Sequence, residues 1–298
     1  MQMQAWNLKF VNLMGCLLVF TTTHIMAESK NFKNDKQNVQ TIEYKNVPQQ
    51  VSFDSVTELP FKPASEKIAY GTDELQYGLL WPSQIKTAKP LIVLVHGGCW
   101  LNAFGVDHSY PVATALSQAG FPVWSLEYRR TGDEGGGWPG SFEDIKLALN
   151  RVNLLQDFNI NTEEIVLMGH SAGGHLALLA ANELKDMKFN QVIGLAAITD
   201  VSRYALGDNS CQQATQQFMG GLPHEVSDAY HAANLIYHKL PATVRLLQGD
   251  ADQIVPVIQS ELYEVETQIV PDAGHFDWIH PGSPAFKQLL NILKDKSI

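Results

Sequence analysis

Six short apolar runs alternate with stretches of helical spacing from residue 91 to residue 294, and this alternation constrains the fold most. Strands that are apolar at nearly every position are typical of a parallel sheet covered by helices on both faces. Two earlier segments, around 67–70 and 75–81, are expected to add antiparallel edge strands. The runs are LIVLVHGG (91–98), FPVWSLEYR (121–129), EIVLMGHS (164–171), VIGLAAITD (192–200), TVRLLQGD (243–250) and TQIVPDAGH (267–275), and the helical stretches are 107–119, 141–156, 173–187, 225–239, 256–265 and 284–294.

A serine follows the third run directly, in GHSAGG (169–174), and an apolar helical stretch comes next. Ligands bind such sheets beyond the carboxyl ends of the strands, so residues at these positions are the first candidates. A serine in a tight strand-to-helix turn is held in a strained backbone geometry and points out of the sheet. Its neighbours two positions away must be small, because strand and helix nearly touch. Ser171 is therefore the predicted nucleophile.

Glycines after the first run, in HGGCW (96–100), allow backbone N–H groups to approach a ligand oxygen. A nucleophilic serine needs such donors for the negative oxygen of a tetrahedral intermediate. We expect Gly98 and Cys99 to supply them together with Ala172, with Gly97 as a further option. Cys99 as the nucleophile is rejected, because its loop carries no obvious base.

A carboxylate and a histidine follow the last two runs, in DADQIVP (250–256) and AGHF (273–276). Asp252, in the turn beyond its strand, is favoured over Asp250 as the group that orients the histidine. His275 is favoured over His280, and it completes the chain order Ser, Asp, His.

Neither a metal nor a cofactor is expected. The DxD motif is followed by an isoleucine, which excludes a calcium loop, and the histidines beside Ser171 lack HExxH spacing. The three cysteines, Cys16, Cys99 and Cys211, have no CxxC spacing, which excludes a zinc ribbon. The sequence leaves open whether Cys99 and Cys211 pair.

Composition excludes further classes of protein. Hydrophobic residues make up 45% of the chain, enough for a real core. The formal net charge of -10 repels phosphates, so a nucleic-acid partner is not expected.

The first residues are typical of an export signal. A positive charge at Lys9 precedes an apolar run over 10–20 that is too short to span a membrane, and a small residue, Ala27, ends the segment. We expect a signal peptide over 1–27, a loosely structured arm over 28–60, and a catalytic domain over 61–298. The protein is then periplasmic or secreted, and a lipid anchor at Cys16 is the alternative.

Collectively, VHGGCW, LEYRR, EIVLMGHSAGGHLALLAA, QGDADQIVP and DAGHF resemble the α/β-hydrolase superfamily, from about residue 68 to residue 293. The resemblance is nearest to HGG-type esterases and to kynurenine formamidase (arylformamidase)-like serine hydrolases. It implies an α/β-hydrolase fold with Ser171 as nucleophile, Asp252 as orienting acid and His275 as base, and it supports Gly98, Cys99 and Ala172 as oxyanion donors. Cys99 stands where hormone-sensitive-lipase-like relatives usually carry a third glycine. The connection over 201–240 is too short for a large cap domain.

The resemblance implies a carboxylesterase that acts on small esters. An amidase, peptidase or arylformamidase with the same triad is the first alternative, although formamidase relatives are ordinarily intracellular. A catalytically silent binding protein of the same fold is the second. Three aromatic residues near the site, Trp100, Tyr128 and Trp138, are expected in the core rather than in the substrate pocket.

Overall fold

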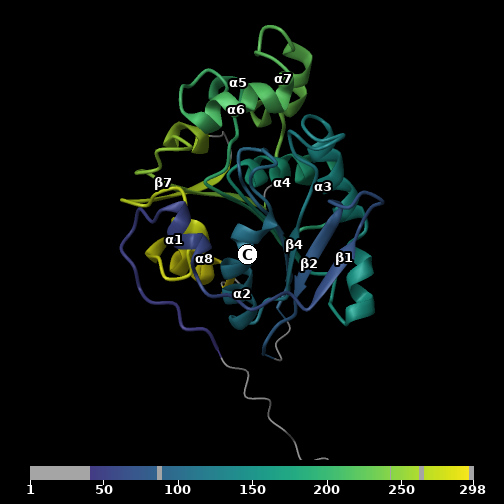
Figure 1. Cartoon of the computed structure of the whole chain (residues 1–298), viewed down its shortest axis with the longest axis vertical. Helices are drawn as coiled ribbons and strands as arrows, with labels where there is room; N and C mark the ends of the chain where they lie inside the picture. The colour runs from purple at the N-terminus through teal and green to yellow at the C-terminus, as the bar shows by residue number, and fades with distance from the viewer. Residues whose placement is uncertain (1–40, 86–88, 242, 262–264, 295–298) are drawn as a thin grey trace, which may run out of the picture. The chain divides into compact units, whose positions relative to one another are not determined.

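The computed structural model describes residues 41–85, 89–241, 243–261 and 265–294 (Figure 1). The predicted signal peptide and the first part of the predicted arm lie outside these residues. The described chain is built on an eight-stranded sheet of order β1-β2-β4-β3-β5-β6-β7-β8. Its strands are β1 (Glu66–Ala69), β2 (Tyr77–Trp81), β3 (Leu91–Val95), β4 (Val123–Leu126), β5 (Ile165–His170), β6 (Gln191–Leu195), β7 (Val244–Gly249) and β8 (Glu266–Val270).

The pairing of the strands confirms the mostly parallel sheet. Strands β3 to β8 run parallel, and β2 pairs antiparallel with both β1 and β4, as expected for the two early segments. Every residue of β3, β4, β5 and β6 is buried, because helices cover both faces of the sheet. The parallel strands therefore end at one edge, where the candidate residues gather.

Alternate residues of the central strands enter two separate cores. On one face, α3 (Gly140–Asn150) and α4 (Ala172–Glu183) pack against residues such as Val93 and Val95. On the other face, α2 (Tyr110–Gln118) and α8 (Pro284–Lys294) pack against residues such as Ile92 and Leu94. This alternation is the period-two geometry of a strand with two buried faces.

The connection between β6 and β7 forms three short helices where the sequence predicts one helix over 225–239. These are α5 (Val201–Tyr204), α6 (Ser210–Met219) and α7 (Ser227–Ala233), at the top of Figure 1. They are no large cap, in agreement with the expectation. Asn209 and Gln212 begin α6 with reciprocal side-chain to backbone hydrogen bonds, a capping box that the sequence analysis overlooked.

The helix expected over 256–265 is wrong. In the described part of that segment only a 3-10 turn forms, over Val257–Ser260. The buried Gln259 side chain instead accepts hydrogen bonds from the backbone N–H groups of Thr199 and Asp200, both at 2.8 Å. The predicted helix does not form because the Gln259 side chain is held by the backbone of the loop after β6.

Residues 41–60 pack closely on the second core, whereas the sequence predicts a loose arm over 28–60. The segment carries the short helix α1 (Phe53–Thr57), in which Val56 is fully buried. The backbone N–H of Gln50 donates to the buried carboxylate of Asp277 at 2.7 Å, and that of Ile42 donates to Gln118 at 2.7 Å. Apolar side chains on this segment cover α2 and α8, which accounts for the close packing.

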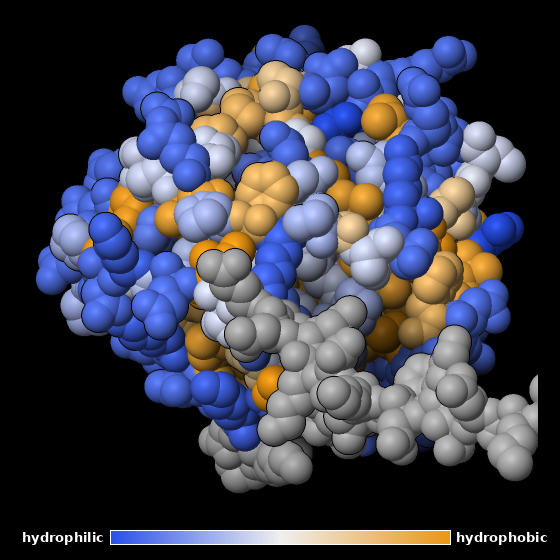
Figure 2. Space-filling model, turned by 60° about the horizontal axis from the view of Figure 1, so that its bottom comes forward, coloured by the Kyte–Doolittle hydropathy of each residue, from blue (hydrophilic) through white to orange (hydrophobic). Residues whose placement is uncertain are grey.

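Hydrophilic side chains predominate on the face seen in Figure 2, and apolar side chains surface there in separate patches. None of the described helices is both long enough and apolar enough to cross a membrane.

Candidate active site

Ser171 occupies the turn between β5 and α4 with a backbone φ of 54° and ψ of -120°. A positive φ is strained for a residue with a side chain, and such strain persists only where the surroundings impose it. Here they do. A Cβ at Gly169 would lie 2.2 Å from the carbonyl oxygen of Gly173, and a Cβ at Gly173 would lie 2.3 Å from that of His96. The strand and helix meet as closely as the GHSAG pattern predicts.

Asp252 and His275 are brought together as the sequence predicts. The Nδ1 atom of His275 lies 2.8 Å from Oδ2 of Asp252. The other carboxylate oxygen accepts the backbone N–H groups of Ile254 and Val255, each at 2.8 Å. Burial raises the pKa of Asp252, but His275 and these N–H donors outweigh it, and the pKa is lowered. The carboxylate is therefore ionised and aimed at the imidazole.

The two alternative residues have other partners. Asp250 is exposed and accepts the backbone N–H of Asp272 at 2.7 Å. The Nδ1 atom of His280 accepts the N–H of Gly282 at 3.1 Å. The choice of Asp252 over Asp250 and of His275 over His280 therefore agrees with the geometry.

The rings of His170 and His175 each form a hydrogen bond with a backbone carbonyl oxygen. The Nε2 atom of His170 donates to the carbonyl oxygen of His275 at 3.0 Å, and that of His175 donates to Ala233 at 2.8 Å. Burial lowers the pKa of His170 well below its usual range, so the ring is neutral. His170 therefore helps to fix the loop that carries His275.

The loop after β3 turns sharply, with φ of 107° at Gly98, 53° at Cys99 and 57° at Trp100. In the described part of the chain, no hydrogen bond uses the backbone N–H of Gly98, Cys99 or Ala172 as its donor. Ala172 is the first residue of α4, where N–H groups have no intrahelical partner. These three donors, predicted from the sequence, are free to bind a negative oxygen.

A buried charge network that the sequence analysis missed holds this loop from behind. The Nδ1 atom of His96 donates to the carbonyl oxygen of Gly97 at 2.7 Å, and its Nε2 lies 2.9 Å from Glu127. Arg130 also contacts Glu127, at 3.3 Å. Because the carbonyl and N–H of a trans peptide point in opposite directions, the grip on Gly97 also fixes the direction of the Gly98 N–H. The sequence signal that could have revealed this network is Glu127, a charged residue near the end of the largely apolar run 121–129.

This network predicts an acid-dependent loss of stability. Burial raises the pKa of Glu127, but His96, Arg130 and the Val106 N–H together lower it from 4.5 to about 2. A lowered pKa means that the carboxylate stabilises the fold fully above pH 4.5 and loses this effect as the pH falls towards 2. We expect Glu127→Gln to cost on the order of 3 kcal/mol of unfolding free energy at neutral pH.

Chemical denaturation of both proteins between pH 7 and pH 2.5 measures the effect. The difference between wild type and variant should shrink below pH 4.5, whereas the exposed Glu134→Gln control should match wild type throughout. A constant difference across this range would contradict the assigned role of Glu127.

A cavity of about 270 Å³ opens beside Ser171 and His275. Its walls are mainly apolar, and three phenylalanine rings from distant segments form one side. The ring of Phe53 lies 5.7 Å from that of Phe104 and 5.4 Å from that of Phe276, measured between centroids. The lining residues are Phe53, Gly98, Cys99, Phe104, His108, His170, Ser171, Asn209, Ser210, Cys211, Ile254, His275 and Phe276.

The expected core aromatics are absent from these walls. Trp100 and Tyr128 are fully buried in the first core, and Trp138 packs against it. Phe53 lies in the segment predicted as a loose arm, where no local pattern marks it as a lining residue.

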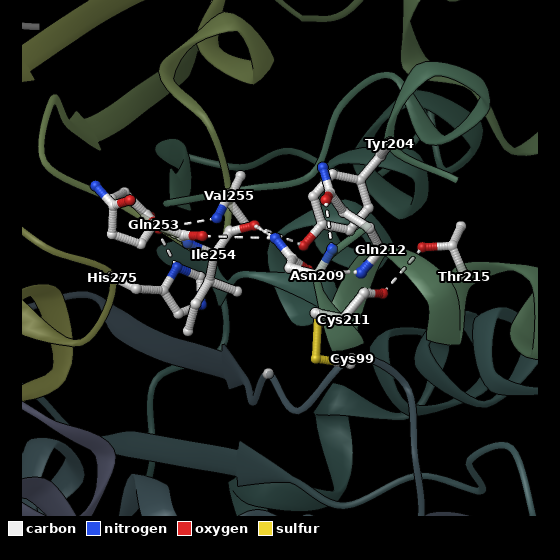
Figure 3. Close-up of a disulfide and its surroundings, with 12 residues drawn as sticks. Cys99, Tyr204, Asn209, Cys211, Gln212, Thr215, Gln253, Ile254, Val255 and His275 are labelled. Atoms are coloured by element: carbon white, nitrogen blue, oxygen red, sulfur yellow. Dashed lines mark hydrogen bonds and ion pairs between the residues drawn. A yellow bond between two sulfur atoms is a disulfide. The ribbon is translucent and has the colours of Figure 1, made fainter. Parts of the chain in front are cut away.

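Cys99 and Cys211 form a disulfide, which the sequence left open (Figure 3). Their Cα atoms lie 5.2 Å apart, although 112 residues separate them in the chain. The bond joins the loop after β3 to the first turn of α6, and both cysteines line the cavity.

The strand order and the serine turn between β5 and α4 define an α/β-hydrolase fold, which confirms the fold that the motifs imply. The chain belongs to the BD-FAE family, whose model matches residues 78–266, more than half of the sequence.

The chain is also similar to individual proteins. The chain is 27% identical over 203 residues to the uncharacterized protein YfhR of Salmonella typhi, an alignment that covers 64% of this chain and 66% of YfhR. It is 24% identical over 241 residues to Esterase LipC of Mycobacterium tuberculosis, which covers 70% of this chain and 59% of LipC. The chain thus spans slightly less than two thirds of the length of these relatives.

Among solved structures, Esterase B from Lactobacillus rhamnosis superposes with a TM-score of 0.63 at 19% identity. The superposition covers 81% of this chain and 88% of Esterase B. At this identity the likeness shows the shared fold.

Proposed function

We propose that this protein is a serine hydrolase, a carboxylesterase that cleaves small esters through Ser171, His275 and Asp252. One observation carries the proposal: His275, hydrogen-bonded to the buried and ionised Asp252, lines the same cavity as the strained Ser171. A nucleophile, a base and an orienting acid are the parts that acyl transfer requires.

The proposed reaction uses these groups in turn. The Nδ1–H of His275 donates to Asp252, which leaves Nε2 to accept the hydroxyl proton of Ser171. The serine oxygen then bonds to the ester carbon, and the electron pair of the carbonyl moves to its oxygen. The N–H groups of Gly98, Cys99 and Ala172 stabilise that oxyanion. Its collapse breaks the bond to the alcohol, which leaves with the proton from His275, and water releases the acyl group by the same steps.

An amidase or peptidase would use the same groups, since esters and amides share the tetrahedral intermediate. The relative LipC is named an esterase, which supports ester bonds over amide bonds as the target of this chain. Against a silent binding protein stands the strained φ at Ser171, which costs free energy that binding alone does not require.

Colourimetric substrates test the proposal. We expect hydrolysis of p-nitrophenyl esters, fastest for short acyl chains because the cavity is only about 270 Å³, and little or no turnover of aminoacyl-p-nitroanilides. Preferential turnover of the anilides would establish an amidase or peptidase instead, and preferential turnover of N-formylkynurenine would establish an arylformamidase.

Phe53 should set the acyl-chain preference. Phe53→Ala removes one of the three rings that close the cavity, so we expect the fastest p-nitrophenyl ester to become longer by several carbon atoms. Phe61→Ala is the matched control, because Phe61 lies only eight residues further along the chain, is 45% exposed and packs on Tyr110 outside the cavity. An unchanged chain-length profile in Phe53→Ala would contradict this role.

We also propose that the protein is exported, with cleavage after Ala27. The Cys99–Cys211 disulfide supports this location, because such bonds persist in oxidising compartments. Mass spectrometry of the mature N-terminus tests it, and an N-terminal lipidated Cys16 would establish the lipid-anchored alternative.

A further inference from the structure

Helix α6 holds the loop after β3 at two consecutive residues. Cys99 is bonded to Cys211 at the start of the helix. Next to it, the indole of Trp100 stacks on the ring of Phe218, with centroids 4.5 Å apart and planes inclined by 7°. Cys211 and Phe218 are separated by seven positions, about two helical turns, and therefore share one face of α6. Both are buried.

The same end of α6 is tied to the loop that carries the orienting acid. The side chain of Asn209 donates to the carbonyl oxygen of Ile254 at 3.0 Å, and the hydroxyl of Tyr204 donates to the same oxygen at 2.9 Å. The N–H of Ile254 in turn donates to Asp252. Figure 3 shows the disulfide, Asn209 and Ile254 in this order, leading towards His275. The first turn of α6 thus connects the loop after β3 that carries the predicted oxyanion donors (residues 96–100, the donor loop) to the loop that carries Asp252 (residues 250–256).

The donor loop needs such support. Cys99 and Trp100 are non-glycine residues in the left-handed region of backbone space, a conformation that persists only where contacts impose it. A glycine would adopt that conformation without steric cost. Cys99 lacks the backbone freedom of a glycine, but its side chain is covalently bonded to Cys211.

We propose that Cys211 is a positioning residue for the oxyanion donors: its disulfide to Cys99 holds the Cys99 backbone in the conformation that presents its N–H to the reacting oxygen. The proposal rests on the proposed esterase function. Reduction by a dithiol supplies two electrons and two protons, cleaves the S–S bond into the two thiols, and converts the dithiol into its own disulfide. The Trp100–Phe218 stack remains, so reduction releases Cys99 without removing the second anchor.

The test compares oxidised and dithiol-reduced wild type with Cys211→Ser, which lacks the bond but leaves the donor loop unchanged in sequence. We expect kcat for a p-nitrophenyl ester to fall about tenfold or more on reduction, but by no more than the 10²–10³-fold loss that follows removal of a whole donor. KM should change little, because the donors act on the transition state. Reoxidation should restore kcat in wild type, and Cys211→Ser should have the low kcat with or without dithiol.

Amide hydrogen exchange over residues 96–102 gives a second reading that does not depend on turnover. Exchange there should be faster in reduced wild type and in Cys211→Ser, with the amides of β3 and β5 unchanged. Unchanged kcat and unchanged exchange, after mass spectrometry has shown complete reduction, would overturn the proposal. A loss of protection throughout the sheet would also overturn it, because the bond would then support the whole fold. If the oxidised protein hydrolyses no ester and reacts with no fluorophosphonate, the esterase function fails, and the exchange result still decides whether Cys211 holds the loop.

Discussion

Replacing Ser171 with alanine should abolish ester hydrolysis, with a fall in kcat of at least about 10⁴-fold. In the proposed mechanism the hydroxyl oxygen of Ser171 forms the bond to the acyl carbon, and alanine has no such oxygen. Alanine is smaller than serine and lacks only the hydroxyl group, so it creates no clash in the strained turn and the fold should persist. A fluorophosphonate probe measures the effect directly, because it forms a covalent bond with the activated serine oxygen.

The control for this labelling is Ser227→Ala, at an exposed serine in α7 that is outside the cavity. Wild type and Ser227→Ala should label equally, and Ser171→Ala should not label at all. Labelling of a folded Ser171→Ala protein would mean that another residue is the nucleophile.

Replacing Asp252 with asparagine should lower kcat by about 10⁴-fold. The amide nitrogen of asparagine is a donor, so it favours the imidazole tautomer with the proton on Nε2. That tautomer cannot accept the proton of Ser171. The charge that stabilises the imidazolium is lost as well.

Asp250→Asn is the matched control, since Asp250 lies two residues away, is exposed and accepts only the N–H of Asp272 among the described residues. Its kcat should stay within about twofold of wild type, as expected for a surface substitution. Thermal unfolding should accompany both measurements, because Asp252 also accepts two backbone N–H groups. Equal losses in the two variants would contradict the orienting role of Asp252.

Parts of the site that one contiguous segment encodes could be predicted. GHSAGG specifies a strand, a tight turn and a helix in succession, and both flanking glycines meet backbone where a Cβ would clash. The HGG loop is equally local. Asp252 and His275 follow the carboxyl ends of parallel strands, and such ends meet at one edge of the sheet, so the order of strands along the chain sufficed to bring them together.

Other features required contacts that no local pattern encodes. Phe53 lies more than 200 residues before Phe276, yet their rings meet in one wall of the cavity. The charge network around Glu127 joins the ends of β3 and β4, and it needed the register of those two strands.

The alternation of apolar runs and helical stretches determined the parallel sheet, and the motifs at the strand ends determined which residues meet beyond it. Only the tertiary structure decided what surrounds them: Phe53 of the 41–60 segment contributes to the wall of the cavity, and α6 contacts the loop after β3 through Cys211 and Phe218. The reason is physical. Backbone geometry within one strand and its turn depends on adjacent residues, whereas the packing of side chains depends on which distant segments share a face, and no periodicity in the sequence records that.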